Sequence, residues 1–341
     1  EGDLSRRDFT VNSMALELTT TVPEFIDPFN GIDDLAKKIL RTPASAEQSF
    51  SDDPLRMMRA ARFASQLDFT LDEDVVEAMR DMSGRISIIS AERVRDEFVK
   101  MLMSPNPRIG ITILVDTGIA EHVLPEIPKL RLEIDEHHHH KDVYEHSITV
   151  LEQAIKQEDR LGGPNLVNRL AALLHDIGKP KTRNLIAGGG VSFHHHEVVG
   201  ARLAKSRMKA LRFDNETIDA VETLVALHLR FHGYGDGEWT DSAVRRYVRD
   251  AGELLTHLHV LTRADCTTRS LKKAERLSRT YDGLEDRIAK LMEEEELSKI
   301  RPDLDGAQVM QLLGIKPSAD VGKALDFLME LRMEHGPLGE E

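Results

Sequence analysis

Cysteine is almost absent from this sequence, since Cys266 is the single cysteine in 341 residues. One thiol excludes an internal disulfide and a zinc site built on cysteines. Aromatic residues make up only 5% of the chain. No apolar run approaches the roughly 20 residues that cross a bilayer, and no secretory signal pattern opens the chain. These absences exclude a disulfide scaffold and predict a cytoplasmic protein with no membrane partner.

The sequence also lacks an excess of positive charge. Its formal net charge is −14, with 45 Lys and Arg against 59 Asp and Glu. This balance argues against nonspecific nucleic-acid binding over the whole surface, but it permits a local basic groove. The first hundred residues contain arginines that could line such a groove, namely Arg6, Arg7, Arg56, Arg59, Arg62 and Arg95.

Chain length and hydrophobic spacing predict a mainly α-helical, multidomain protein. Residues 1–35 hold short mixed segments and read as the end of an α/β domain. Residues 36–130 carry apolar side chains at helical spacing and form a second region. Residues 131–275 are rich in histidine and mostly helical, with one predicted hairpin at Arg183–Phe193 around three glycines. Residues 276–341 predict a helical tail that begins with a charged helix around Glu293-Glu294-Glu295-Glu296 and continues in short helices.

The most informative stretch of the second region begins at Asp53-Pro54. This dipeptide predicts a helix start, with Asp53 as the N-cap and Pro54 as the first helical residue. Arg56, Arg59 and Arg62 then recur at every third position and share one broad helix face. One interpretation is a solvated helix whose arginines pair with carboxylates.

A second interpretation follows from the hydrogen-bonding capacity of these side chains. A carboxylate only accepts hydrogen bonds and a guanidinium only donates them. Held side by side, Asp53 and Arg56 match a base edge that offers an amino donor beside a ring-nitrogen acceptor. Cytosine and adenine present that order, whereas guanine and uracil present the reverse. The sequence therefore predicts a site that selects C and A, with Arg59 and Arg62 on phosphate oxygens.

Four motifs in order over about a hundred residues then carry a resemblance to a known family. Arg6-Arg7-Asp8-Phe9-Thr10-Val11-Asn12 resembles the RRDFTxN motif of class II tRNA nucleotidyltransferases, the CCA-adding and poly(A) polymerase family. The other three matches are Asp27-Pro28 through Asp34-Leu35, Asp52-Asp53-Pro54-Leu55-Arg56 as the EDxxR base-recognition motif, and Ser90-Ala91-Glu92-Arg93 with Glu97. The base-recognition match departs from its pattern at Asp52, where the family usually has Glu.

The resemblance implies a fold, an activity and a set of nucleotide-binding residues. The fold would be the end of a nucleotidyltransferase head domain (1–35), a helical neck (36–130), an all-α HD domain (131–275) and a helical tail (276–341). The activity would be addition of C and A to the tRNA 3′ end from CTP and ATP, or poly(A) synthesis. The implied nucleotide-binding residues are Arg6, Arg7, Asp8, Asn12, Asp53, Arg56, Arg59 and Arg62.

The catalytic carboxylates of the family are not found among the motifs of this sequence. In the family, an Asp-x-Asp pair that binds two Mg²⁺ ions follows a Gly-rich strand and turn, and both precede the RRDFT motif. Neither occurs ahead of Arg6 in this sequence. We therefore expect this chain to bind nucleotide weakly at best and to transfer none, while a longer parent would be the active enzyme.

Histidine chemistry is concentrated in the third region, where 13 of the 15 histidines lie between His137 and His259. His175-Asp176 ends a predicted helix at Leu166–Ile177 and is followed by Ile177-Gly178-Lys179. The order of possible ligands resembles that of HD-superfamily phosphohydrolases: His146, His175, Asp176, His196, His228 and Asp265. Imidazoles and carboxylates without thiolates suit Mn, Ni, Co, Fe, Mg or Zn.

A metal ion at these residues would support phosphatase or 2′,3′-cyclic phosphodiesterase activity. A metal-dependent HD phosphohydrolase is therefore the second function that the sequence permits. A third is an RNA-binding protein without activity, which would hold no metal. The run His137–His140 is interpreted as a solvated segment rather than a site, because consecutive helical residues face different directions.

Overall fold

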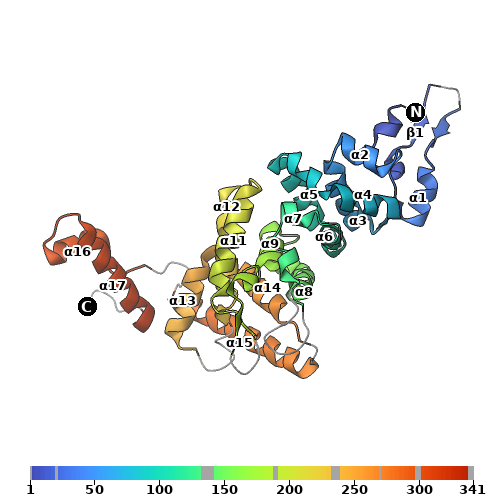
Figure 1. The fold of residues 1–341 in the computed structure, drawn as a ribbon. Helices are drawn as coiled ribbons and strands as arrows, with labels where there is room; N and C mark the ends of the chain where they lie inside the picture. The colour runs from blue at the N-terminus through green and yellow to red at the C-terminus, as the bar shows by residue number, and fades with distance from the viewer. Residues whose placement is uncertain are drawn as a thin grey trace. The chain divides into compact units, whose positions relative to one another are not determined.

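The fold is described from a computed structural model of the chain (Figure 1). The structure describes residues 2–19, 22–131, 142–186, 191–231, 239–268, 270–295 and 301–336. Most of these residues are helical, and the strands within them form three two-stranded sheets. The predicted mainly α-helical fold is confirmed. The chain divides into two compact units, Glu1–Ala226 and Leu227–Glu341.

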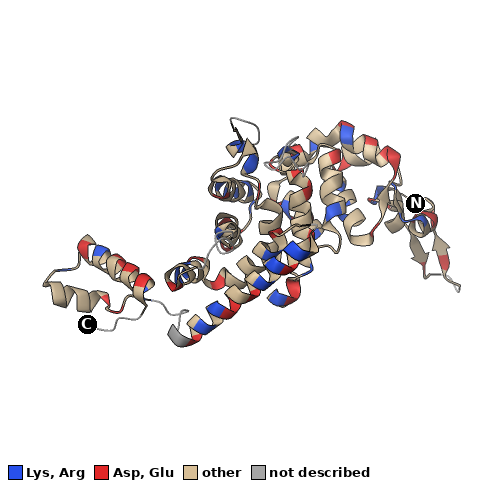
Figure 2. Ribbon diagram, turned by 90° about the horizontal axis from the view of Figure 1, so that it is seen from below, with Lys and Arg blue, Asp and Glu red and all other residues tan. Residues whose placement is uncertain are grey.

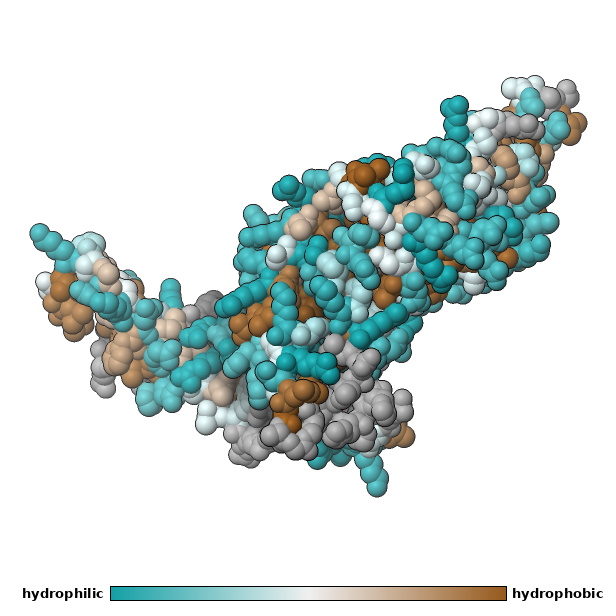
Figure 3. Space-filling model, in the orientation of Figure 1, coloured by the Kyte–Doolittle hydropathy of each residue, from teal (hydrophilic) through white to brown (hydrophobic). Residues whose placement is uncertain are grey.

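The first unit begins with short strands and small helices. Its first part contains β1 (Ala15–Glu17), β2 (Glu24–Ile26), α1 (Gly31–Lys37), β3 (Ile39–Leu40), α2 (Ala46–Asp52), α3 (Leu55–Leu67), β4 (Thr70–Leu71), α4 (Glu73–Met82), α5 (Ala91–Leu102), α6 (Pro107–Asp116) and α7 (Ala120–Val123). β1 and β2 pair antiparallel, and β3 and β4 pair parallel. Figure 3 shows apolar side chains at the β1–β2 end, where Leu16, Leu18 and Phe25 are exposed.

The rest of the first unit holds the histidine-bearing elements. These are α8 (Val143–Ile155), α9 (Leu166–Leu174), α10 (Lys179–Thr182), β5 (Asn184–Leu185), β6 (Val191–Ser192), α11 (His196–Ala210) and α12 (Asn215–Leu227), the last of which ends at the boundary. β5 and β6 pair antiparallel, so the predicted hairpin is confirmed. Its three glycines lie outside the described residues.

Helix α3 lies at the centre of the first part of this unit. It packs against α5 and α6, and its small residues Ala60, Ala61 and Ala64 are fully buried. Gly110 of α6 fits closely, because a Cβ there would lie 2.4 Å from Ser65 Oγ. Ser65 Oγ instead accepts a hydrogen bond of 2.8 Å from the Gly110 amide. This packing fixes the rotation of α3 and hence the face that carries its arginines.

Two helix ends differ from the sequence prediction. α3 begins at Leu55 with Pro54 as its N-cap, although Asp53 still accepts a 3.1 Å hydrogen bond from the Leu55 amide. Pro54 already has helical φ and ψ, so the difference is one residue at a boundary. α9 ends at Leu174 rather than Ile177. His175 therefore caps the helix, and a turn carries the chain through Gly178.

The second unit is helical. It contains α13 (Asp241–Ala251), α14 (Leu255–Asp265), α15 (Leu271–Glu295), α16 (Gly306–Leu313) and α17 (Ala319–His335). Tyr281 of α15 is buried, and its hydroxyl donates a 2.7 Å hydrogen bond to the Thr262 carbonyl of α14. The charged helix predicted around Glu293 corresponds to α15, which has 25 residues and begins at Leu271, ahead of the predicted start of the tail. None of the described helices combines the length and the apolar character that crossing a membrane requires.

Candidate nucleotide-binding and metal sites

The arginine face of α3 meets the beginning of the chain through Asp8. Arg59 Nε donates a 2.7 Å hydrogen bond to Asp8 Oδ2, and Arg59 Nη2 donates to the same oxygen. Arg56 Nε lies 3.5 Å from Asp8 Oδ1. A carboxylate far away in sequence thus holds two guanidinium groups of one helix face. These are charge-assisted contacts with defined geometry.

Arg56 makes further contacts inside this cluster. Its Nη1 donates a 2.9 Å hydrogen bond to Ser49 Oγ, and its Nη2 donates to the Arg6 carbonyl. The side chains of Arg6 and Arg7 are exposed, and Arg7 pairs with Asp3 at 3.2 Å. Asn12 Oδ1 accepts a hydrogen bond from the Phe9 amide. Of the first predicted motif, Asp8 and the Arg6 carbonyl reach α3 directly.

Asp53 lies at the start of α3 and pairs with an arginine of α5. Arg93 Nη2 is 3.1 Å from Asp53 Oδ2, and the Asp53 side chain is 33% exposed. Asp52, one residue earlier, instead accepts a hydrogen bond from Gln48 on its own helix. Asp53 and Arg56 therefore lie three residues apart at the start of α3, with different ion-pair partners.

Glu97 of α5 contacts Arg59 and Arg62, the second and third arginines of the α3 face. Its side chain is 4% exposed, and Oε2 lies 2.6 Å from Arg62 Nε. Arg59 Nη1 lies 3.9 Å from Glu97 Oε1. Arg62 also stacks over the Phe63 ring at 4.1 Å. Arg93 and Glu97 are absent from the predicted site residues, although both belong to the fourth motif and their i, i+4 spacing puts them on one face of α5.

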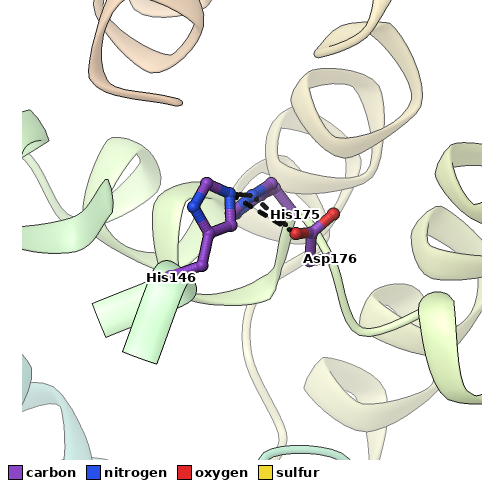
Figure 4. Close-up of side chains that lie close together, drawn as sticks. All are labelled: His146, His175 and Asp176. Carbon is purple, nitrogen blue, oxygen red and sulfur yellow. Dashed lines mark hydrogen bonds and ion pairs between the residues drawn. The ribbon is translucent and has the colours of Figure 1, made fainter. Parts of the chain in front are cut away.

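The histidine-bearing elements of the same unit bring four predicted ligands together. His146 comes from α8, His175 and Asp176 from the end of α9, and His196 from the first position of α11. Figure 4 shows the first three, with the two imidazoles and the carboxylate directed at one another. Their ligand atoms lie within 4.8 Å of one another. His196 Nε2 approaches from another side, 3.2 Å from Asp176 Oδ1.

The hydrogen bonds behind the imidazoles set their tautomers. His175 Nδ1 lies 2.8 Å from the Ala172 carbonyl, and His196 Nδ1 lies 2.9 Å from the Phe193 carbonyl. A carbonyl only accepts, so each Nδ1 must carry a proton, and Nε2 is the ring nitrogen that faces Asp176. Metal-binding histidines commonly show this arrangement.

The groups around Asp176 keep its carboxyl ionised, as a metal ligand must be. Burial opposes ionisation of this carboxyl, but His175 and Lys179 outweigh burial and hold the pKa of Asp176 well below its ordinary value. Lys179 Nζ is 2.8 Å from Asp176 Oδ2. His175 Nε2 lies 3.2 Å from Asp176 Oδ2, and His196 Nε2 lies 3.2 Å from Asp176 Oδ1. This donor set fits a divalent cation.

Gly178 allows the turn after His175 to approach α11. A Cβ at this position would lie 2.1 Å from the His196 carbonyl oxygen and 2.7 Å from the Gly200 nitrogen. Both are backbone atoms that cannot rotate away. Glycine is therefore required for the close approach that sets His196 beside Asp176.

The two remaining predicted ligands belong to the second unit. His228 is buried and follows α12, and Asp265 is the last residue of α14. They remain predicted ligands. The run His137–His140 lies outside the described residues.

Three family models match successive parts of the chain. Residues 1–41 match the "Poly A polymerase head domain", residues 68–130 match the "Probable RNA and SrmB-binding site of polymerase A", and residues 143–292 match the "HD domain". Their order is the order of the motifs along the sequence. The HD match covers the elements that carry His146, His175, Asp176 and His196.

Named relatives agree with these matches. An A-adding tRNA nucleotidyltransferase of Deinococcus radiodurans is 35% identical over 97% of this chain and 75% of its own length. A multifunctional CCA protein of Neisseria meningitidis serogroup A is 35% identical over 69% of this chain and 54% of its own length. The match therefore spans about half of the Neisseria protein.

Solved structures share the fold. The CCA-adding enzyme of Bacillus stearothermophilus, crystallised with CTP, has a TM-score of 0.66 at 23% identity, over 99% of this chain and 71% of that one. The Thermotoga maritima CCA-adding enzyme, complexed with tRNA, has a TM-score of 0.58 at 20% identity, over 100% of this chain and 71% of that one. Sequence motifs, site geometry, family models and relatives agree, and the chain belongs to the tRNA nucleotidyltransferase family of enzymes.

Proposed function

We propose that this chain selects C and A nucleotides for addition to the 3′ end of tRNA, as the base-selecting part of a cytoplasmic CCA-adding nucleotidyltransferase. The observation that carries the proposal is that an acceptor, Asp53, and a donor, Arg56, lie three residues apart at the start of α3. Their partners, Arg93 and Asp8, come from different elements and hold the two side chains in place.

Both groups keep the capacity to bind a base. A carboxylate has about four lone-pair sites, and Asp53 uses one on each oxygen, for the Leu55 amide and for Arg93. A guanidinium has five N–H donors. The contacts of Arg56 to Asp8, Ser49 and the Arg6 carbonyl leave at least one N–H on Nη2. Asp53 can accept from the amino group of cytosine or adenine while Arg56 donates to the neighbouring ring nitrogen.

The ion pairs suggest different roles for the other two arginines. The Arg59 side chain is 31% exposed, so it can reach a phosphate oxygen while bound to Asp8. Arg62 is 11% exposed and is held by the buried Glu97. This pairing favours Arg59 for a phosphate contact and gives Arg62 a positioning role.

Nucleotide binding tests the proposal directly. We expect CTP and ATP to bind this chain more tightly than GTP and UTP in isothermal titration calorimetry. A reversed base edge leaves partners unsatisfied at about 1–3 kcal/mol per buried group, or about 5- to 150-fold in affinity. The partial exposure of Asp53 favours the lower end. Asp53→Asn should reduce the preference, while Asp52→Asn, one residue away and bonded to Gln48, should not. Equal affinity for the four nucleotides in the wild type would overturn the proposal.

The reaction products distinguish the proposed function from the other activities of the family. Addition of both C and A to tRNA that lacks its 3′ end distinguishes a CCA-adding enzyme from a poly(A) polymerase or from enzymes that add only CC or only A. The Deinococcus relative is named for A addition alone. Nucleotidyl transfer also needs Mg²⁺ held by carboxylates, and we assign no described residue to that task. Sequencing of the products would decide among these activities.

A second candidate function is supported by the histidine cluster. His146, His175, Asp176 and His196 would hold a divalent transition metal or Mg²⁺. Such an ion supplies Lewis-acid activation of water and of a phosphate oxygen. Lys179, against Asp176 and over the Phe193 ring, adds positive charge that favours a phosphate ester nearby.

Hydrolysis assays test this second function. We expect turnover of 2′,3′-cyclic AMP or p-nitrophenyl phosphate with added Mn²⁺, Ni²⁺ or Mg²⁺, and its loss in His175→Ala. His122→Ala serves as a control because His122 is exposed and belongs to α7, outside the cluster. Metal binding without turnover of either compound would leave the cluster a structural metal site and contradict this function.

A further inference from the structure

A surface cleft in the first unit shares no lining residue with the two candidate sites. It is lined by α5, by Leu166 at the start of α9 and by the turn between α11 and α12 (Figure 1). Its volume is about 540 Å³. Sites for small molecules typically have about 300–1,000 Å³ and combine apolar surface with a few polar groups. We call this cavity the α5–α9 cleft.

Three cations line the α5–α9 cleft. The Arg212 side chain is 70% exposed, and within the described part of the chain its guanidinium has one ion pair, with Glu92 at 3.9 Å, and no hydrogen bond. Arg95 keeps one N–H on each terminal nitrogen after its contacts with Asp96 and the Arg212 carbonyl. Lys100 is 54% exposed. The cleft therefore offers charged donors to an anion.

Apolar surface beside these cations distinguishes the cleft from the rest of the charged surface. Lys and Arg are interspersed with Asp and Glu along the helices (Figure 2), so positive charge alone marks no site. In the cleft, Phe213, Val99 and Leu166 are all only partly buried. Arginine binds phosphate with two parallel hydrogen bonds, and an aromatic ring stacks on a planar group. The lining thus fits a ligand that has both an anionic group and a planar body.

Two carboxylates in the lining limit the charge of the ligand. Three cations against two carboxylates, Asp96 and Asp214, leave the lining with a formal charge of +1. Asp214 accepts hydrogen bonds from the Thr217 amide and hydroxyl, and Asp96 accepts from Arg95. This balance suits one phosphate group better than a polyanion, which needs several cations. The remaining carboxylate lone pairs can accept from hydroxyl or amino groups of the ligand.

We propose that the α5–α9 cleft binds a nucleoside monophosphate, with the phosphate on Arg212 and Arg95 and the planar base against Phe213. The ligand would tie α5 to the α11–α12 turn, which the hydrogen bond from Arg95 to the Arg212 carbonyl already joins. α5 also carries Arg93 and Glu97, so the ligand would contact the helix that supports the arginine face of α3. The inference does not depend on the proposed function.

Titration calorimetry of the whole chain with GMP and UMP, in the presence of EDTA, tests the proposal. These nucleotides are chosen because the start of α3 is expected to reject guanine and uracil, and EDTA removes metal from the histidine cluster. Inorganic phosphate and guanosine are titrated separately, since each carries one half of the recognised chemistry. We expect GMP and UMP to bind at least about 10-fold more tightly than either half. Both should raise the melting temperature of the chain.

Arg212→Gly removes the side chain at a position where glycine suits the backbone. Arg212 has a φ of 60°, in the left-handed region, and its contact with Arg95 is made by a carbonyl that glycine retains. Lys38→Gly is the matched control. Lys38 is an exposed cation with a φ of 58°, and its carbonyl accepts a hydrogen bond from the Thr70 amide. Both variants lose one positive charge and relieve similar backbone strain, so only the place of the lost side chain differs.

We expect Arg212→Gly to weaken GMP binding about 10-fold or more and to abolish the rise in melting temperature, while Lys38→Gly stays within about twofold of the wild type. Phe213→Leu keeps an apolar side chain but removes the planar ring. It should weaken GMP binding about 5-fold or more and leave phosphate binding unchanged.

Four results would overturn the proposal. They are a wild type that binds neither GMP nor UMP, equal losses in the two glycine variants, GMP binding that Arg212→Gly leaves unchanged, and phosphate binding as tight as GMP binding. Loss of binding to a tRNA transcript in Arg212→Gly, without loss of GMP binding, would also overturn it and assign the cleft to RNA.

Discussion

Gly178→Ala should disrupt the candidate metal cluster of His146, His175, Asp176 and His196 without removing any of these side chains. The added Cβ would stand 2.1 Å from the His196 carbonyl oxygen and 2.7 Å from the Gly200 nitrogen. Ordinary contact begins near 3.4 Å, so the turn and α11 must separate by roughly 1.3 Å, the difference between 3.4 and 2.1. That movement carries His196 Nε2 away from Asp176, where it now lies at 3.2 Å.

Two quantities follow from this displacement. Overpacking against backbone should lower the free energy of unfolding by about 1–3 kcal/mol. Misplacing one ligand should weaken Mn²⁺ or Ni²⁺ binding by about 10- to 100-fold, the range seen when ligand orientation is disturbed. Titration calorimetry with each metal measures the affinity, and urea denaturation measures the stability.

Gly283→Ala provides the matched control for this prediction. Gly283 lies in α15, and a Cβ there would meet nothing within 4 Å. Alanine should therefore stabilise the helix by about 0.5–1 kcal/mol and leave metal affinity unchanged. If Gly178→Ala bound metal within about twofold of the wild type, the role assigned to the close approach of the turn and α11 would be refuted.

Three further predictions concern ion pairs and a cap in the first unit. Glu97→Gln removes the charge that faces Arg62 in a buried pair and should cost about 3–5 kcal/mol in urea denaturation; a loss below about 1 kcal/mol would contradict the anchoring role. Arg169→Met leaves buried Glu158 and the carbonyls of Leu102 and Ser104 without their partner, so a similar loss is expected, whereas exposed Lys156→Met should be neutral. The Thr217 amide and hydroxyl lower the pKa of Asp214. The Asp214 carboxylate therefore stabilises the fold above its unfolded pKa, near 3.9, and this stabilisation is lost as the pH falls through the lower folded pKa. In acid denaturation, the difference in stability between Asp214→Ala and the wild type should vanish at low pH.

Local sequence signals predict much of the fold. Apolar spacing indicates the helices between residues 36 and 130, and three glycines between short apolar runs indicate the β5–β6 hairpin. Both depend on neighbours in sequence, which a single chain displays. The predicted end of α9, at Ile177, is three residues late, because Ile177 continues the apolar spacing although the chain already turns at His175.

Ion pairs between residues far apart in the sequence are harder to predict from the sequence. The spacing of Arg56, Arg59 and Arg62 leaves two interpretations, solvated ion pairs or a nucleotide site. The structure shows that Asp8 holds two of the arginines and Glu97 the third. Which carboxylate meets which arginine depends on how α3, α5 and the start of the chain pack together. The pairing of Asp53 with Arg93 escapes sequence reasoning for the same reason.

The candidate metal cluster is likewise only partly predictable from the sequence. The His175-Asp176 pair is evident from adjacent residues, and the ligand order comes from the family resemblance. Nothing in the sequence indicates that the Ala172 and Phe193 carbonyls fix the tautomers of His175 and His196. The role of Gly178 in the approach of α11 is equally hidden, because it depends on the backbone of a distant helix.

A crystal structure of the chain with CTP bound is the most direct test of nucleotide selection by α3. Selection by Asp53 and Arg56 predicts the cytosine amino group within hydrogen-bonding distance of the Asp53 carboxylate, and ring nitrogen N3 facing the Arg56 guanidinium. Arg93 should remain against Asp53. A cytosine that contacts neither side chain, or that presents its edge in the reverse order, would contradict this assignment.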